Sequence, residues 1–145
     1  MTFEIPITAR FHEVDRAGII FFGRVFEYAH TCYEELLIAA FGGFDRLFDE
    51  RGFGTPIVHS EADFRRPIRQ SDRLIVRARV EGLSSRSITF CYEIIGDGGA
   101  DDLRCTVQMK HAFVSLDNFR AIECPAFFTT GLKGIGLLDA PLLEQ

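Results

Sequence analysis

The apolar residues of this chain follow a helical period in one segment, 25–40, and a period of two in the segments on either side, and this pattern limits the folds open to the chain. In the first third they recur at spacings of three and four, which indicates one long amphipathic helix. The helical positions are Val25, Ala29, Cys32, Leu36 and Ala40. The glycines in "FGG" at 41–43 are typical of the end of a helix. From residue 55 onward apolar and polar residues alternate, which indicates strands.

The order of the expected elements predicts an α+β layer. The alternation in "FEIPITARFH" predicts a first strand that runs to Phe11, and Pro6 within it indicates an edge position or a bulge. A short second helix is expected over 44–52. The later strands are expected in 55–64, 73–80, 87–95 and 104–116, and "RAIECP" is a candidate for a last short strand. Turn-forming segments separate them, with a hairpin tip at 97–102, so neighbouring strands should pair antiparallel and one face should bury the long helix.

Composition narrows the functional classes. A chain of 145 residues with 47% hydrophobic and 26% charged residues is expected to form one domain, residues 1–145. It has no apolar run of membrane-spanning length and no basic segment leading into an apolar one at the N-terminus, so a cytoplasmic location is expected. The net charge of −5 argues against nucleic-acid binding. The four cysteines form no C-x-x-C pair, so no metal site is expected.

Three segments, in order, resemble one known family. They are "VDRAGIIFFG" before the helix, "ERGFGTPIVHSEADF" at the entry to the second strand and "RAIECPA" near the end. With the element order, they are similar to the hotdog-fold acyl-CoA thioesterases, in the 4-hydroxybenzoyl-CoA thioesterase branch. The resemblance implies a single hotdog domain, in which an antiparallel sheet wraps around one long central helix.

Thioester hydrolysis needs a nucleophile or base at the carbonyl carbon and donors for the charge that grows on the carbonyl oxygen. The first N–H groups of a helix are unpaired and carry partial positive charge, so the backbone N–H of Phe22, with Gly23 beside it, is the expected donor. Gly18 would let the backbone approach the substrate closely. Asp15 is expected to attack the carbonyl or to activate a water. The alternative is that Asp15 only caps the helix or stabilises its loop.

Five further residues are expected to bind substrate. The resemblance implies that Arg86 and Ser87 form a basic turn that meets the phosphates of coenzyme A, and Arg120 is a second candidate. For both arginines a solvated turn position is an equal alternative. Thr55 is expected to line the pantetheine channel. His59 is expected to touch a ring hydroxyl of the substrate or to position a water, and an ordinary hydrogen-bonded histidine is the alternative.

Other charged residues are expected to have no chemical role. In a second hotdog branch the catalytic carboxylate comes from the central helix, which makes Glu34 and Glu35 the corresponding candidates here. Asp15 matches its own branch better, so both glutamates are expected to be solvated or at an interface. His12, Lys110 and His111 fall in strand patterns and are expected on the sheet surface or at an interface.

The sequence therefore predicts an acyl-CoA thioesterase. Phe22 stands where some related hotdog enzymes have a histidine, which favours an aromatic acyl group such as 4-hydroxybenzoyl, benzoyl or naphthoyl. The alternatives are a short or branched aliphatic acyl-CoA, an acyl carrier protein thioester, or a non-catalytic acyl-CoA-binding module. No cofactor is expected, because coenzyme A is part of the substrate. The family implies a homodimer with the active site between protomers, assembling to a homotetramer.

Overall fold

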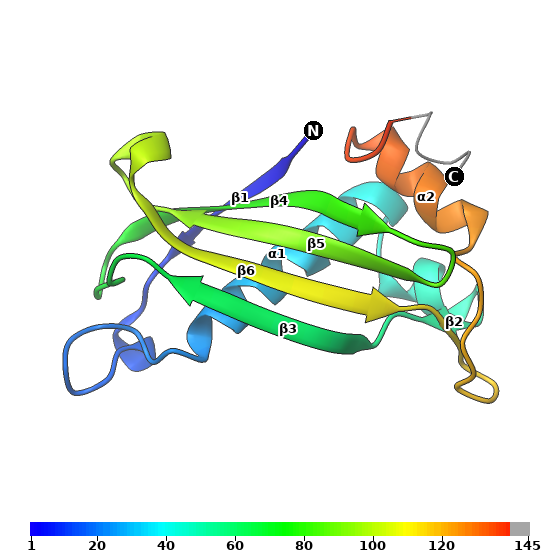
Figure 1. The fold of residues 1–145 in the computed structure, drawn as a ribbon, viewed down its shortest axis with the longest axis horizontal. Coiled ribbons are helices and arrows are strands. Elements are labelled where there is room, and N and C mark those ends of the chain that lie inside the picture. Colours follow the sequence, from blue (N-terminus) through cyan, green and yellow to red (C-terminus); the bar gives the residue numbers. More distant parts are fainter. Residues whose placement is uncertain (140–145) are drawn as a thin grey trace.

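The computed structural model of the chain describes residues 1–139. A five-stranded antiparallel sheet lies against one long helix, α1, which crosses behind the sheet in Figure 1. The larger elements are β1 (Phe3–Thr8), α1 (Arg24–Phe41), β3 (Ile57–Phe64), β4 (Arg73–Leu83), β5 (Ser87–Ile95), β6 (Leu103–Ala112) and α2 (Ala126–Gly134). The shorter ones are η1 (Phe11–Glu13), η2 (Asp45–Asp49), β2 (Phe53–Gly54), η3 (Gly99–Asp101) and β7 (Val114–Ser115). The expected α+β hotdog architecture is confirmed.

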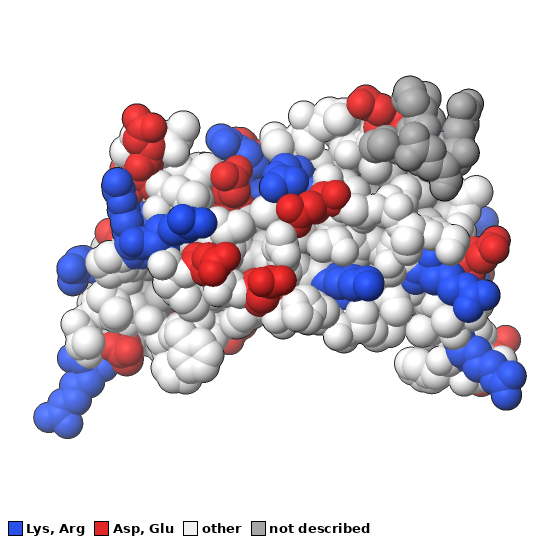
Figure 2. Space-filling model, viewed as in Figure 1, with Lys and Arg blue, Asp and Glu red and all other residues white. Residues whose placement is uncertain are grey.

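The order of strands in the sheet is β1-β4-β5-β6-β3, with every neighbouring pair antiparallel. Alternate residues of β6 are buried on the α1 side, as the period of two predicts, and in β5 the alternate set from Ile88 to Ile94 is buried together with Cys91 and Ile95. The opposite face of the sheet is turned to the viewer in Figure 2, which shows acidic and basic side chains interspersed over it. No single-sign patch forms on that face.

Helix α1 buries the predicted stripe. Val25, Ala29, Cys32 and Leu36 are fully buried against the sheet. The helix ends at Gly42, whose φ of 84° is left-handed and therefore suits glycine. At its C-terminal end α1 packs against α2, where the Phe41 ring lies directly over Gly131.

Three expectations about elements need correction. The first strand ends at Thr8, because Ala9 turns inward and exchanges backbone hydrogen bonds with 71–72 instead of continuing the ladder. Phe11 begins the turn η1 and is 76% exposed. The segment "RAIECP" contributes only an isolated bridge between Ala121 and Val114. The short second helix is one π-helical turn, η2.

Strands β1 and β3 form the two edges of the sheet. Pro6 lies in β1, which confirms the predicted edge position. Strand β3 pairs only with β6 among the described strands, and all its residues except the half-buried Ala62 are exposed. Ile57, Val58 and Phe64 are among the most exposed apolar side chains of the molecule. An exposed strand edge that carries apolar side chains is a template for pairing with another strand.

Candidate functional site

The loop between β1 and α1 carries Asp15 at its exposed tip. The loop is a small antiparallel turn, closed by a bridge between Val14 and Ile20 and by the Asp15 N–H, which donates to the Ile19 carbonyl at 2.8 Å. One carboxylate oxygen of Asp15 accepts from the Ala17 N–H at 2.8 Å. Gly18 has a φ of +82°, which a non-glycine residue adopts at a cost. The second carboxylate oxygen accepts no hydrogen bond from a described residue.

The loop leads into the N-terminus of α1, where two backbone donors are free. Helix α1 begins at Arg24 with Gly23 as its N-cap, and the Arg24 N–H donates back to the Phe21 carbonyl at 2.9 Å. Neither the Phe22 N–H nor the Gly23 N–H donates to any residue that the structure describes. Two adjacent unpaired N–H groups at a helix N-terminus are well suited to a developing oxyanion. Asp15 therefore lies at the entrance of a helix whose donors are available.

Glu13 anchors this loop to the helix. Its backbone carbonyl accepts from the Phe21 N–H at 2.9 Å, and its carboxylate accepts from the Tyr28 hydroxyl at 2.8 Å. Burial and the neighbouring Glu13 carboxylate raise the pKa of Tyr28, so the phenol stays protonated and keeps donating. The positions of Asp15 and Phe22 are thus fixed relative to α1.

A hollow of about 320 Å³ opens beside the loop at the C-terminal end of β3. Ile19 and Phe22 line it from the loop, and Phe64 and Pro67 line it from the sheet side. Phe22 is 61% exposed and its ring lies 4.8 Å from that of Phe21. The walls are mostly apolar, so the hollow suits an apolar group beside the free donors.

Thr55 lies at the other end of β3, in a buried polar group. Its hydroxyl is 2.7 Å from the Tyr33 hydroxyl, and its carbonyl accepts from Nδ1 of His111 at 2.9 Å. The His111 ring stacks on Tyr33 with centroids 4.3 Å apart. His111 is fully buried, so its expected position on the sheet surface is wrong. Alternate residues of β6 face α1, and His111 is one of these residues, which is why it is buried.

The expected phosphate contacts gather at the same end as Thr55. The Arg86 carbonyl accepts from the Phe113 N–H at 3.1 Å, and the Arg120 carbonyl accepts from the Ser115 N–H at 2.9 Å. Both arginines are exposed, and the Ser87 hydroxyl is 2.7 Å from that of Ser84. Each arginine thus lies beside the 113–115 segment, and neither guanidinium is hydrogen-bonded to a residue that the structure describes.

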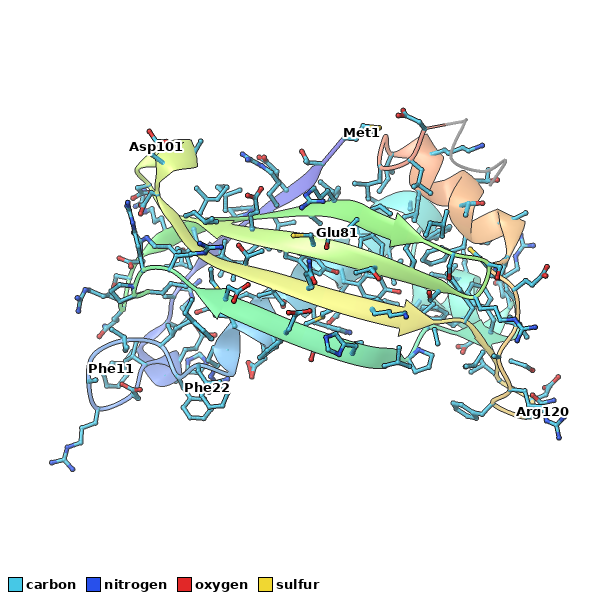
Figure 3. All side chains as sticks on the ribbon, in the orientation of Figure 1. Met1, Phe11, Phe22, Glu81, Asp101 and Arg120 are labelled. Atoms are coloured by element: carbon cyan, nitrogen blue, oxygen red, sulfur yellow. The ribbon has the colours of Figure 1, made fainter. Side chains whose placement is uncertain are left out.

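A single chain does not bring the Asp15 loop and the expected phosphate-binding residues together. Figure 3 shows Phe22 and Arg120 beyond opposite ends of β3, and both project past the open edge of that strand. The eight residues of β3 span about 23 Å at ~3.3 Å per residue. Asp15, Gly18, Phe22 and Gly23 are therefore at one end, and the expected substrate-binding residues Thr55, Arg86, Ser87 and Arg120 are at the other.

His59 lies on the face of the sheet that points away from α1. The register places it opposite Lys110, whereas Ser60 lies opposite the buried Met109. Its Nε2 is 3.2 Å from the Glu61 carboxylate on the same face. This placement favours the ordinary hydrogen-bonded histidine over the expected contact with a substrate ring.

A second hollow, of about 380 Å³, lies on the α1 side of the open edge and was not expected from the sequence. Phe26, Ile57 and Met109 form apolar walls, and His30 and Glu34 face it from α1. His30 Nδ1 is 2.9 Å from the Glu34 carboxylate. The available signal was the spacing of four residues on one helix, which places both side chains on the same face.

The described residues offer neither a metal site nor a membrane-spanning helix. Within 1–139 no three or more His, Cys, Asp or Glu side chains are grouped as metal ligands would be. None of the helices in that range combines the length and apolar character needed to cross a membrane.

The fold and the helix-terminal donors define a hotdog protein, and comparison with known proteins agrees. A 1,4-dihydroxy-2-naphthoyl-CoA thioesterase from Synechocystis superposes with a TM-score of 0.81 at 24% identity, covering 92% of this chain and 96% of that one. The model of the thioesterase-like superfamily matches residues 9–132. The chain belongs to this superfamily, which confirms the predicted family and an enzyme of the thioesterase class.

Two sequence relatives are both named 1,4-dihydroxy-2-naphthoyl-CoA hydrolase. The one from Picosynechococcus is 27% identical over 148 residues, with 100% of this chain and 98% of that one covered. The one from Nostoc punctiforme is 31% identical over 94 residues, which cover 65% of this chain and 64% of that one. The likeness to the Picosynechococcus protein runs along the whole chain.

Proposed function

We propose that this protein hydrolyses an aromatic acyl-CoA thioester, with Asp15 as the catalytic carboxylate and the N-terminus of α1 as the oxyanion site. The observation that carries the proposal is the pair of free N–H groups at Phe22 and Gly23, seven and eight residues after an exposed Asp15 on a fixed loop. The alternative role for Asp15, stabilising its loop, uses one carboxylate oxygen, which accepts a hydrogen bond from the Ala17 N–H. The second oxygen stays available for chemistry.

The chemistry needs only water in addition to the substrate. The Asp15 carboxylate either adds to the thioester carbonyl carbon or removes a proton from a water that adds there. The carbonyl oxygen becomes negatively charged and accepts from the Phe22 and Gly23 N–H groups. The C–S bond then breaks and coenzyme A leaves as the thiolate. On the general-base route this sulfur receives the proton that Asp15 removed from the water, and on the nucleophilic route it receives a proton from the water that later hydrolyses the anhydride. By the first route an acyl-aspartyl anhydride forms, and water hydrolyses it to the acid. No cofactor is proposed.

A second copy of the chain would complete the site. Pairing two β3 edges antiparallel about a two-fold axis at Ser60 sets His59 opposite Glu61 of the other copy, an attractive pair on the outer face. The exposed Val58 then lies opposite Ala62, and the end of β3 near Phe64 meets the beginning of the other β3. This arrangement brings the Asp15 loop of one copy to the Thr55 end of the next. We therefore propose a homodimer with shared sites.

The proposed substrate class rests on the apolar hollow beside Phe22 and on the relatives named as naphthoyl-CoA hydrolases. Arg86, Ser87 and Arg120 of the second copy are proposed to meet the phosphates of coenzyme A, because they lie at the Thr55 end of β3, where Arg120 projects past the open edge. The thioester of an aliphatic acid or of an acyl carrier protein is the alternative. A homotetramer and a cytoplasmic location stay predictions from the sequence.

The test is thiol release from a panel of aromatic and aliphatic acyl-CoAs, with wild type and Asp15→Asn side by side. Asparagine keeps the shape and the Ala17 contact while removing the base or nucleophile, so a loss of ~10² or more in kcat is expected. An aromatic CoA that is cleaved by wild type only supports the proposal. Binding of CoA thioesters without cleavage would instead favour the non-catalytic module. If Asp15→Asn still cleaves the thioester, a residue other than Asp15 is the catalytic group.

A further inference from the structure

A partly buried ion cluster centred on Arg104 of β6 has no role in the chemistry described so far. Arg104 holds the Asp102 carboxylate with two hydrogen bonds, from Nε at 2.8 Å and from Nη2 at 3.0 Å. Its remaining nitrogen, Nη1, donates to the Asp72 carboxylate at 2.7 Å and to the Pro67 carbonyl at 3.0 Å. The side chains of Arg104 and Asp102 are only 16% and 15% exposed. A guanidinium enclosed and paired in this way has little freedom to move.

Two of these hydrogen bonds end on the 65–72 turn, which joins β3 to β4. The Asp72 oxygen that accepts from Arg104 also accepts from the Arg69 N–H at 2.8 Å. At the beginning of the turn, the N–H groups of its first two residues donate to the Arg104 carbonyl at 2.8 and 3.1 Å. Arg104 therefore holds this turn near both of its ends, by its backbone and by its side chain.

The loop that carries Asp15 pairs with the same turn. The Ile20 N–H donates to the Ile68 carbonyl at 2.8 Å, and Ile19 forms an isolated bridge with Arg69. Within the loop the Ile19 carbonyl accepts from the Asp15 N–H at 2.8 Å. A continuous series of hydrogen bonds thus runs from the Arg104 guanidinium through the turn to the backbone of Asp15. A shift of the turn would move the loop.

We infer that Arg104 is a positioning residue for the thioesterase reaction, which fixes the 65–72 turn and thereby sets the Asp15 carboxylate relative to the thioester. The inference rests on the proposed function, since Asp15 is the catalytic group proposed there. Misplacing a reacting group by about 1 Å can cost ~10²-fold in rate, so loss of the cluster should lower kcat. KM should change little, because the residues proposed to bind coenzyme A lie at the other end of β3.

The experiment measures kcat and KM for Arg104→Lys and Asp72→Asn, with the acyl-CoA that wild type cleaves best. Lysine keeps the positive charge, but one ammonium group cannot span two carboxylates and a backbone carbonyl as the guanidinium does. Asp72→Asn keeps the size of the side chain and removes the charge that links Arg104 to the turn. Urea unfolding of each variant shows that it is folded under the assay conditions.

Two control substitutions separate positioning from a general loss of stability. Arg77→Lys makes the same chemical change in a more exposed ion pair, with Glu4. Gly131→Ala places a Cβ against the Phe41 ring and so disturbs the packing of α2, away from the Asp15 loop. Both controls should keep the wild-type kcat, and Gly131→Ala should do so although it lowers the free energy of unfolding.

Arg104→Lys is expected to lower kcat by ~10-fold or more, with KM changed by less than about threefold, and Asp72→Asn should lower kcat by a smaller factor. In the Asp15→Asn background Arg104→Lys should slow the residual cleavage by less than about twofold, because the group it positions is already removed.

An unchanged kcat in both Arg104→Lys and Asp72→Asn overturns the inference. A loss of kcat that Gly131→Ala reproduces at equal destabilisation also overturns it, and so does an undiminished effect of Arg104→Lys in the Asp15→Asn background. In each of these cases wild type still cleaves the thioester, so the thioesterase proposal stands. If wild type cleaves no thioester, the proposed function itself fails and this inference fails with it.

Discussion

Acidification should destabilise this protein through His111. The side chain is fully buried, and burial lowers the pKa of His111 from 6.5 to about 4, with nearby His30 adding to the decrease. The Thr55 carbonyl partly opposes this change by accepting from Nδ1. In the unfolded chain the imidazole regains a pKa near 6.5. The unfolded state therefore binds more protons between these two values, and the free energy of unfolding falls as the pH falls through this window.

The size of the effect follows from the two pKa values. The stability that His111 contributes is fully present above pH 6.5. Through His111 the free energy of unfolding falls by about 2 kcal/mol between pH 7.5 and 5, and by about 3 kcal/mol by pH 4. The assay is urea unfolding at a fixed protein concentration at pH 7.5, 6 and 5, for wild type and His111→Asn. The asparagine amide can still donate to the Thr55 carbonyl but does not titrate.

The difference between the two proteins isolates His111. Asp102 does not interfere above pH 5, because its carboxyl is already ionised there in the unfolded chain, with a pKa near 3.8, and the Arg104 guanidinium lowers that pKa further in the folded protein. Wild type should lose about 2 kcal/mol more than His111→Asn between pH 7.5 and 5. Equal losses in the two proteins would refute the argument that His111 is buried in its neutral form.

Three substitutions and one control substitution test the packing and the loop. Gly131→Ala should lower the free energy of unfolding by about 1–3 kcal/mol in denaturant titrations, because a Cβ there collides with the Phe41 ring; an unchanged value would mean that α2 does not pack as described. Tyr33→Phe should cost about 1 kcal/mol by the same measurement, through loss of the hydroxyl contact with Thr55, and a neutral result would place that contact in doubt. Gly18→Ala should cost about 1 kcal/mol, because alanine disfavours a φ of +82°, whereas Gly134→Ala, in open space without a positive φ, should be tolerated.

Local sequence patterns were sufficient to predict the helices and strands, because each pattern depends on residues that are neighbours in the chain. The spacing from Val25 to Ala40 predicted α1, and the period of two predicted the later strands, because a helix or strand buries one face whatever lies against it. The first strand was predicted three residues too long. Ala9 keeps the alternating pattern, but its backbone pairs with the 71–72 turn, and no local signal reports a partner so distant in sequence.

The sequence by itself determined the class of fold, the family and the position of Asp15 ahead of a helix, because these depend on periodicity and on motifs that are contiguous in the chain. Only the tertiary structure decided which residues share a site. The parity of β6 buried His111, the register of β3 turned His59 away from α1, and the length of β3 separated Asp15 from Arg120. The His30–Glu34 pair gained a context only when Ile57 and Met109 packed beside it. These relations depend on strand pairing between distant segments, and such pairing is fixed by the packing of the whole domain.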